Sequence, residues 1–282
     1  MISIESWREA GAFFDFRGRR VFYRRQGSGP PLLLVHGYPT SSWDWTPIWP
    51  GLTSRFDVIA PDMLGFGFSA KPRGHRYTIA EQADLHLALL DELGIDRFDA
   101  LVHDYGVTVG QELLARRTGR VRSIAFLNGG LFPETHRPRR IQRLLASPLG
   151  PVVAQLSSER SFSRSLSAIF GPDTKPTAAD LHAFWQLASR DHGMQALAGL
   201  IGYMRERVEH RERWVGALLE TEVPLVVING IQDPVSGAHM VARLLELRPQ
   251  TKIVRLDVGH YPQVEAPRET LAAYLDFVGT LA

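Results

Sequence analysis

The chain has 282 residues, of which 44% are hydrophobic, so it is long enough to bury a large core. It carries 32 basic and 30 acidic side chains, and a formal net charge of +2 gives no electrostatic case for a nucleic-acid partner. Cysteine is absent, which excludes a disulfide framework, a thiol nucleophile and a thiolate metal site.

Targeting and membrane signals are also missing from the sequence. Residues 1–10 include charged side chains and lack an apolar centre, so we do not expect a secretory signal. No stretch approaches the roughly 18 consecutive apolar residues of a transmembrane segment. We therefore expect a soluble, cytoplasmic protein, and the sequence predicts no particular oligomeric state. Arginines gather at 136–140 and 205–213; solvated faces are the favoured interpretation, and attachment to anionic membranes is the alternative.

Predicted strands and helices alternate through much of the chain. The first two strands flank Arg17-Gly18-Arg19 and should form an antiparallel hairpin, whereas the later apolar runs are typical of strands covered on both faces. A capping box at Thr78-x-x-Glu81 should begin the first helix, which ends near Gly94. Strands are expected at 13–16, 20–25, 32–35, 56–60, 98–102, 124–127, 224–228 and 252–256, and helices at 79–93, 107–117, 238–247 and 267–281. The alternation predicts an α/β fold with a mostly parallel, doubly wound sheet.

The alternation stops between about 131 and 219. No strand pattern occurs there, and helical patterns cover 178–189, after a Thr177-x-x-Asp180 start, and 194–208. We interpret this segment as an inserted helical cap, residues 131–219. The core would then consist of residues 1–130 and 220–282.

Three polar residues follow predicted strands in loops, where open α/β sheets place their sites. Asp104 lies between the strand 98–102 and the helix that follows, in the strand–turn–helix context of a nucleophile elbow. Asp233 and His260 follow the strands at 224–228 and 252–256. The order nucleophile, acid, histidine is that of the α/β-hydrolase arrangement.

The motifs around these residues carry a resemblance that spans essentially the whole chain. They are His36-Gly37-Tyr38-Pro39, Pro61 to Ser69, His103-Asp104-Tyr105-Gly106, Gln232-Asp233-Pro234 and Gly259-His260-Tyr261-Pro262-Gln263. The chain resembles α/β-hydrolases of the epoxide hydrolase and haloalkane dehalogenase branch. The elbow, the Tyr203 to Trp214 region and the His-Tyr-Pro-Gln ending are most similar to the epoxide-hydrolase-like group of mesoderm-specific transcript homologs. This resemblance implies the α/β-hydrolase fold with a helical cap, and an Asp-His-Asp catalytic triad.

An aspartate at the elbow suits attack on a saturated carbon, because a carboxylate is already ionised at neutral pH. Asp104 would form an alkyl ester, and His260, oriented by Asp233, would activate the water that hydrolyses it. Negative charge then appears on an oxygen of Asp104. The backbone N–H groups of Tyr38 and Tyr105 are the expected oxyanion hole.

The leaving group separates the related activities. The positions that would hold halide in similar dehalogenases are Tyr38 and Tyr105 here, so the halide cradle is missing. Epoxide hydrolases use cap tyrosines as donors to the epoxide oxygen, and Tyr203 is the only tyrosine of the inserted segment. Trp185, His182 and His192 are candidates for the second donor. The candidate substrate-binding residues are Tyr203, Trp185, His36 and His103. Of these, His36 and His103 lie beside the site, and packing and hydrogen bonding is the favoured interpretation of both.

The leading hypothesis is a cofactor-independent epoxide hydrolase acting on an apolar small molecule and water. No histidine and carboxylate have metal-ligand spacing, so no metal is expected. The alternatives are a haloalkane dehalogenase and, from another class, a non-catalytic protein that uses the cap pocket as a receptor.

Overall fold

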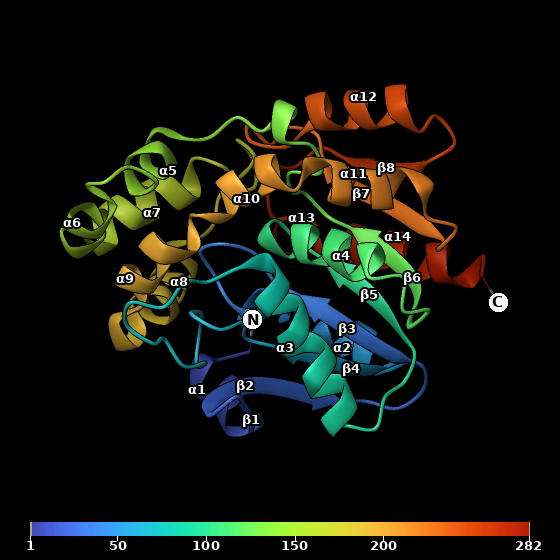
Figure 1. The fold of residues 1–282 in the computed structure, drawn as a ribbon, viewed down its shortest axis with the longest axis horizontal. Coiled ribbons are helices and arrows are strands. Elements are labelled where there is room, and N and C mark those ends of the chain that lie inside the picture. The colour runs from blue at the N-terminus through green and yellow to red at the C-terminus, as the bar shows by residue number, and fades with distance from the viewer. Residues whose placement is uncertain (1, 282) are drawn as a thin grey trace.

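An eight-stranded sheet runs through the molecule in the order β1-β2-β4-β3-β5-β6-β7-β8 (Figure 1). The computed structural model describes residues 2–281; Met1 and Ala282, the outer ends of the predicted core segments 1–130 and 220–282, lie outside them. β2 pairs antiparallel with β1 and β4, and all other neighbours are parallel. The strands are β1 (Ala12–Phe16), β2 (Arg19–Gln26), β3 (Pro31–Val35), β4 (Asp57–Pro61), β5 (Phe98–Val102), β6 (Val121–Phe126), β7 (Leu225–Gly230) and β8 (Lys252–Leu256). The predicted hairpin and the mostly parallel α/β sheet are confirmed.

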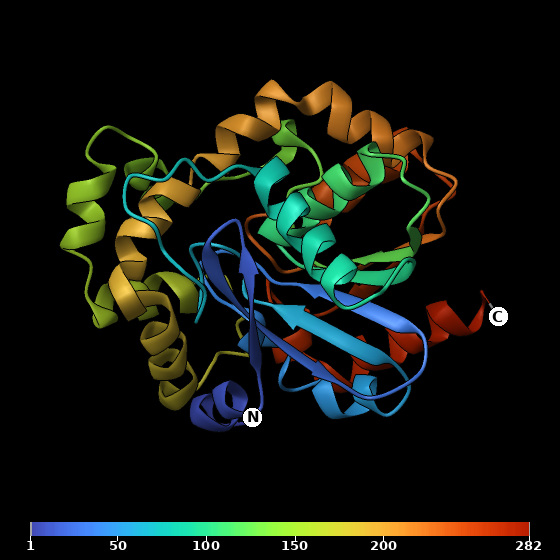
Figure 2. The same cartoon turned by 60° about the horizontal axis from the view of Figure 1, so that its bottom comes forward.

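Helices cover both faces of the sheet, as the apolar runs of the central strands require. All five residues of β5 are buried. Figure 2 shows α3 (Ile79–Glu92), α4 (Tyr105–Ala115) and α11 (Arg211–Glu220) over one face, and α2 (Trp49–Thr53) and α14 (Pro267–Gly279) over the other. The remaining elements of the two core segments are α1 (Ile4–Glu9), η1 (Ser42–Trp45), α12 (Ala238–Leu247) and α13 (Pro262–Glu265).

Two helix starts differ from the sequence prediction. Thr78 accepts a hydrogen bond from Glu81 N at 3.1 Å, but the Glu81 side chain does not close the predicted capping box. It pairs instead with His75 at 2.6 Å and Arg19 at 3.4 Å, because the hairpin brings a cation within reach. α4 begins at Tyr105, two residues earlier than predicted, since Asp104 itself is the N-cap.

The segment between β6 and β7 is helical, and among its residues, all of which are described, no strand occurs. Its elements are η2 (Pro133–Thr135), α5 (Arg140–Leu145), α6 (Gly150–Gln155), α7 (Glu159–Ser167), α8 (Ala178–Ser189), η3 (Arg190–His192), α9 (Gly193–Leu200) and α10 (Tyr203–Glu209), followed by α11. The single helix predicted at 194–208 is wrong, because the chain turns at Ile201 and Gly202 between α9 and α10.

These helices lie at one end of the sheet, with α5 to α9 on the left in Figure 1. α11 differs from them, because it packs against α4 on the face of the sheet. The division of the chain into a core and a cap at residue 219 stays a prediction. Within residues 2–281, none of the helices combines the length and the apolar character that crossing a bilayer requires.

Candidate active site

Asp104 occupies a sharp turn between β5 and α4. Its φ of 48° and ψ of −108° lie in a region that side chains rarely adopt, as the elbow prediction requires. The turn is held by Gly106, whose N–H donates to His36 O at 3.1 Å and His103 O at 2.8 Å. A Cβ on Gly106 would lie 2.4 Å from Val35 O, so only glycine allows α4 to begin this close to β3.

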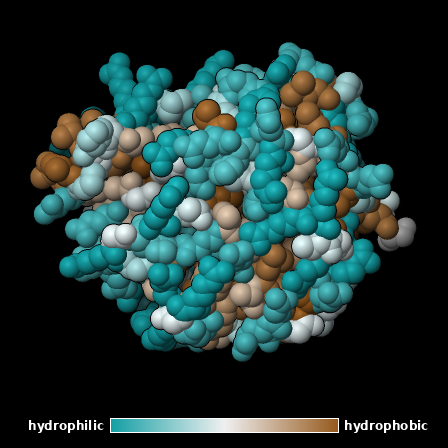
Figure 3. Space-filling view, in the orientation of Figure 1, coloured by the Kyte–Doolittle hydropathy of each residue, from teal (hydrophilic) through white to brown (hydrophobic). Residues whose placement is uncertain are grey.

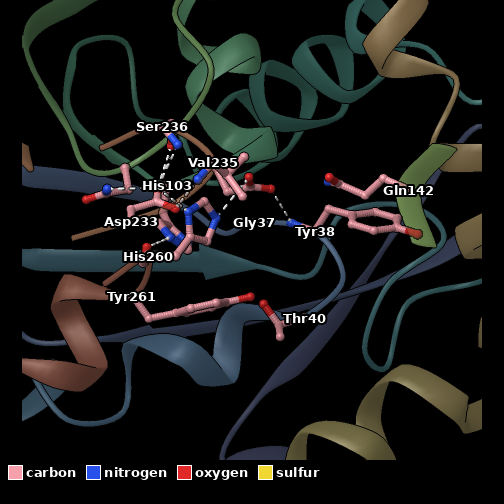
Figure 4. A network of polar contacts seen from close by, with 12 residues as sticks. Gly37, Tyr38, Thr40, His103, Gln142, Asp233, Val235, Ser236, His260 and Tyr261 are labelled. Atoms are coloured by element: carbon pink, nitrogen blue, oxygen red, sulfur yellow. Dashed lines mark hydrogen bonds and ion pairs between the residues drawn. The ribbon is translucent and has the colours of Figure 1, made fainter. Parts of the chain in front are cut away.

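The structure brings the three predicted polar residues together, and Figure 4 shows Asp233 beside His260. His260 Nε2 lies 3.1 Å from Asp104 Oδ2, and its Nδ1 lies 2.7 Å from Asp233 Oδ2. All three side chains are buried. Each residue stands just beyond the end of a parallel strand, and the parallel register places these ends at one edge of the sheet.

Asp233 is held by four hydrogen bonds besides the one to His260. Val235 N donates to Oδ1 at 2.7 Å, while Ser236 N and Oγ donate to Oδ2 at 3.0 and 2.7 Å. Asn128 Nδ2 donates to the same oxygen at 3.0 Å. The carboxylate therefore has a single orientation, and it imposes one orientation on the His260 ring.

Asp104, His260 and Asp233 stabilise one another in their charged forms. Burial alone would lower the pKa of His260, but the Asp233 and Asp104 carboxylates outweigh burial and raise it to about 10. Burial would raise the pKa of Asp233, but His260 and the N–H and O–H donors lower it to about 2. The pKa of Asp104 is also lowered, because His260, His103 and Arg207 outweigh its burial. The resting site thus holds an imidazolium between two carboxylates.

The two expected oxyanion donors differ in their contacts. Tyr38 N donates to Asp104 Oδ1 at 2.9 Å, across 66 residues of sequence. The loop comes this close because residue 37 is glycine: a Cβ there would lie 2.7 Å from Asp104 Cβ. Tyr105 is the first residue of α4, where backbone N–H groups have no acceptor inside the helix. Its N–H is therefore free to bind an oxyanion.

Arg207 is a site residue that the sequence analysis missed. It is buried on α10, and its Nε donates to Thr108 Oγ1 at 2.7 Å. Its Nη2 donates to the backbone oxygen of Asp104 at 3.4 Å, and its guanidinium lies 4.5 Å from the ring centre of Tyr203. Four arginines occur at 205–213, and nothing in the sequence indicated that Arg207 alone would be buried.

A largely apolar pocket lies in front of Asp104 and His260. Its volume is about 790 Å³, counting the part open to solvent. The lining comes from the oxyanion loop, α5, α7, α9 and their connections: Tyr38, Pro39, Asp104, Arg139, Ile141, Gln142, Leu145, Ser157, Ser161, Phe162, Ser165, Leu166, Ile169, Met194, Leu197, Val235 and His260. Such a pocket suits an apolar small molecule.

Gln142 brings a polar group into this lining, and the sequence analysis also missed it. Its Oε1 accepts a hydrogen bond from Arg139 N at 2.8 Å. This contact fixes which end of the amide is oxygen, so Nε2 remains free to donate. Figure 4 shows the side chain extending from α5 toward Tyr38, whose N–H holds Asp104.

The two histidines beside the site make internal hydrogen bonds, as their sequence interpretation expects. His36 Nε2 accepts from Met63 N at 3.0 Å, and its Nδ1 lies 2.9 Å from Gly37 O. His103 Nε2 lies 2.8 Å from His260 O, so this ring positions the loop that carries His260. Burial lowers the pKa of His36 to about 4 and that of His103 to about 3, which keeps both neutral. Neither lines the pocket, so substrate binding by His36 and His103 stays a prediction that the pocket lining does not support.

The predicted cap residues lie one layer behind the pocket wall. The ring of Tyr203 is buried against Tyr38 and Tyr105, with ring centres 6.1 and 5.1 Å apart. Trp185 packs behind the pocket residue Phe162 at 5.5 Å. Substrate binding by Tyr203 and Trp185 stays a prediction that the pocket lining does not support.

Neither His182 nor His192, which were predicted as candidates for the second donor, reaches the site. Both are exposed: His182 contacts Glu159 at 2.8 Å, and His192 contacts Arg73 at 2.9 Å. Within residues 2–281, no three histidine or carboxylate side chains are grouped as a metal site would require.

A sheet of this order, with an acid at the strand–helix elbow and a histidine after the last strand, is the framework of a hydrolase. A family model described as alpha/beta hydrolase fold matches residues 30–267. The chain belongs to the α/β-hydrolase family, and the predicted resemblance is confirmed.

Individual relatives refine this membership. The mesoderm-specific transcript protein of Mus musculus is 42% identical over 296 residues, which cover 99% of this chain and 88% of that protein. Haloalkane dehalogenase 2 of Mycobacterium bovis is 30% identical over 95% of this chain and 94% of its own length. The solved structure of epoxide hydrolase CorEH superposes with a TM-score of 0.79 over 96% of this chain and 99% of that one. Its identity is 20%, so this last likeness concerns the fold alone.

Proposed function

We propose that this α/β-hydrolase opens epoxides of apolar small molecules to diols through an alkyl ester at Asp104. The observation that carries the proposal is the position of the Asp104 carboxylate. Tyr38 N binds one of its oxygens, His260 Nε2 lies 3.1 Å from the other, and both residues line the apolar pocket.

The first step is attack by Asp104 Oδ2 on a ring carbon. A carboxylate of lowered pKa is fully ionised at neutral pH, so no base is needed. A new C–Oδ2 bond forms, the ring C–O bond breaks, and its electron pair stays on the epoxide oxygen as an alkoxide. The Gln142 amide is our candidate donor to that oxygen, because Nε2 is free and the residue lines the pocket.

In the second step, His260 takes a proton from water, and the water oxygen attacks Cγ of the ester. The negative charge of the tetrahedral intermediate falls on Oδ1, where Tyr38 N is already 2.9 Å away and Tyr105 N can join it. The intermediate then collapses: the Cγ–Oδ2 bond breaks, and Oδ2 takes the second proton of the former water molecule and leaves as a hydroxyl of the diol. The water oxygen becomes part of the Asp104 carboxylate.

The charge state of His260 is consistent with an epoxide as substrate. In the resting site the pKa of His260 is raised to about 10 by two carboxylates, so the ring is protonated and is no base. Esterification of Asp104 removes one of these carboxylates and so lowers the pKa of His260. The proton that His260 then releases equals the proton that the alkoxide takes up. Neutral His260 then accepts the proton of water and keeps it when Asp104 is ionised again. The cycle neither takes up nor releases a proton.

Haloalkane dehalogenation is the second candidate, because haloalkane dehalogenase 2 of Mycobacterium bovis is 30% identical to this chain. Halide displacement would use the same ester at Asp104. It would release one proton per turnover, since a halide ion does not take up the proton of His260. The missing halide cradle at Tyr38 and Tyr105 argues against it.

Mass spectrometry of the His260→Gln variant tests the proposal, because this variant forms the ester and hydrolyses it slowly. An epoxide should add its whole mass to Asp104, whereas a bromoalkane would add its mass less that of hydrogen bromide. The His260→Gln/Asp104→Asn double variant is the control and should acquire no mass. An absence of any adduct from a panel of epoxides that bind would contradict the proposal. The receptor alternative would be favoured if the unmodified protein binds a ligand without turning it over and Asp104→Ala leaves this binding unchanged.

A further inference from the structure

The segment from His136 to Ser158, which holds α5 and α6, has basic and apolar side chains but no acidic one. Arg137, Arg139, Arg140 and Arg143 are all exposed. The acids that flank the segment are engaged elsewhere: Glu134 pairs with Arg211 at 2.6 Å, and Glu159 with His182 at 2.8 Å. The positive charge of this segment therefore faces solvent without a neighbouring acid to balance it.

The second arginine cluster, at 205–213, shows the contrast. Arg205 pairs with Glu209, Arg211 with Glu134 and Arg213 with Glu112, at 3.1, 2.6 and 2.8 Å. Arg207 is buried beside Asp104. This second cluster serves the fold, and only the first has its charge available for a partner.

Apolar side chains project from the same segment. α5 and α6 contact each other, and α6 packs on α9. Leu145, Gly150 and Ala154 are buried there, whereas the opposite side of the two helices exposes further apolar residues. The exposed fractions are 44% for Leu144, 61% for Leu149, 54% for Val152 and 78% for Leu156. Figure 3 shows hydrophobic residues gathered at the left end of the molecule, over α6.

Four exposed aliphatic side chains on or directly beside two adjacent short helices are not a scatter of single residues. Such patches mark contact with another apolar body. The charged side chains within residues 136–158 are all arginines, which suits a partner that is apolar inside and negatively charged at its surface. An anionic lipid bilayer has both properties.

We propose that residues 136–158, here named the α5–α6 surface, dock the protein on an anionic lipid bilayer. Leu144, Leu149, Val152 and Leu156 would enter the boundary between headgroups and acyl chains. The four arginines would lie at the level of the lipid phosphates. The protein would bind reversibly at the surface, since short apolar side chains reach only the outer part of a bilayer.

The α5–α6 surface adjoins the pocket. Arg139, Ile141, Gln142 and Leu145 line the pocket, and they belong to α5 or directly precede it. Docking would thus hold the pocket wall against the bilayer, from which an apolar substrate could enter without crossing water. The docking itself requires neither Asp104 nor an ester, so it can fail or hold independently of the proposed function.

Vesicle sedimentation tests the proposal. The full chain should bind vesicles of phosphatidylcholine with 30% phosphatidylglycerol better than vesicles of phosphatidylcholine alone, and salt should weaken the binding. Arg140→Gln and Arg143→Gln should each weaken it about fivefold. Leu149→Ser with Leu156→Ser should weaken it about tenfold or more. Equal binding to neutral and anionic vesicles, or no binding to either, would overturn the proposal.

A matched control lies on α10, where Val208 is 65% exposed and Arg205 is on the surface. Val208→Ser with Arg205→Gln changes one exposed aliphatic residue and one exposed arginine outside the α5–α6 surface and should leave vesicle binding unchanged. A thermal unfolding scan of each variant shows whether it is folded. If the control loses as much binding as the α5–α6 variants, the surface is not the one that docks.

The absence of cysteine allows a second measurement. A single Leu156→Cys substitution can carry an environment-sensitive dye, and Val208→Cys is its control. Anionic vesicles should shift the emission of the Leu156→Cys conjugate to the blue and leave the other unchanged. If the dye shifts without vesicles, in a concentration-dependent manner that matches dimer formation, the surface binds a second copy of the chain and the lipid proposal is wrong.

Discussion

Arg207 reaches Asp104 from a different part of the chain. Its Nη2 donates to the backbone oxygen of Asp104 at 3.4 Å, while its Nε donates to Thr108 Oγ1 at 2.7 Å. Arg207 lies on α10, in the inserted segment, whereas Asp104 and Thr108 belong to the elbow and α4. The position of Asp104 and the pKa of its carboxyl group therefore depend in part on the segment between β6 and β7.

Replacing Arg207 by methionine should raise the pKa of Asp104, because a buried cation that favours the carboxylate is removed. Ester formation should slow about tenfold or more, which corresponds to the loss of charged hydrogen bonds. The measurement is single-turnover ester formation in the His260→Gln background between pH 4 and 8. Arg207→Lys keeps the positive charge, so its pH profile should lie closer than that of Arg207→Met to the profile measured with Arg207 unchanged. An acid limb that does not move in Arg207→Met would contradict this role.

The stability of the protein should fall as the pH rises from about 6.5 to 10. The folded pKa of His260 is about 10, above its value in the unfolded chain, so its contribution is complete below pH 6.5 and is lost as the pH rises through 10. Asp104→Asn removes one of the two carboxylates that raise this pKa. The midpoint of thermal unfolding should then decline less between pH 7 and 10 than in the unmodified protein. An equal decline in both proteins would contradict the assignment.

At low pH the dependence is opposite, because the stability of the protein should fall as the pH falls. The pKa of Asp233 is lowered to about 2, so its contribution is present above pH 4 and is lost as the pH falls toward 2. Ser236→Ala removes a 2.7 Å hydrogen bond to Asp233 Oδ2 and should reduce the stability by about 1 kcal/mol at pH 7. Urea unfolding at pH 7 and pH 3 measures both effects. The difference between the two proteins should shrink at pH 3.

Gln142→Leu should slow ester formation on the order of 100-fold, because the leaving oxygen loses its amide donor. Gln142→Glu keeps an acceptor for Arg139 N but has no N–H, and it should be impaired at least as much. Rapid-quench measurement of the Asp104 ester isolates this step from its hydrolysis. If Gln142→Glu retains the rate of the unmodified protein, Gln142 only caps α5.

Gly106→Ala should destabilise the protein by about 1–3 kcal/mol, because the added Cβ would lie 2.4 Å from the backbone oxygen of Val35. Since both atoms belong to packed elements, the elbow must shift, and Tyr38 N and His260 should no longer meet Asp104 as they do now. Gly216→Ala in α11 is the matched control, with its nearest atom 3.9 Å away. It should stabilise the protein by about 0.5–1 kcal/mol. Chemical unfolding of the two variants checks both signs.

The sequence alone was sufficient for the sheet and for the position of the three polar residues. Apolar runs such as Leu32–Val35 and Phe98–Val102 have few alternatives to a doubly covered strand, and both are buried strands. Parallel strands place their carboxyl ends at one edge, so Asp104, Asp233 and His260 meet once the strands are known. These features follow from local patterns and one topological rule.

The inserted segment obeys no such rule, and there only the tertiary structure was decisive. The break between α9 and α10, the burial of Arg207 and the free amide of Gln142 depend on which helix faces pack against which. The protonation of His260 likewise depends on two carboxylates brought within 3.1 Å by distant parts of the chain. Periodicity along a sequence specifies local conformation and the apolar face of an element, whereas the neighbours of a side chain, and hence its charge, are set by through-space distances.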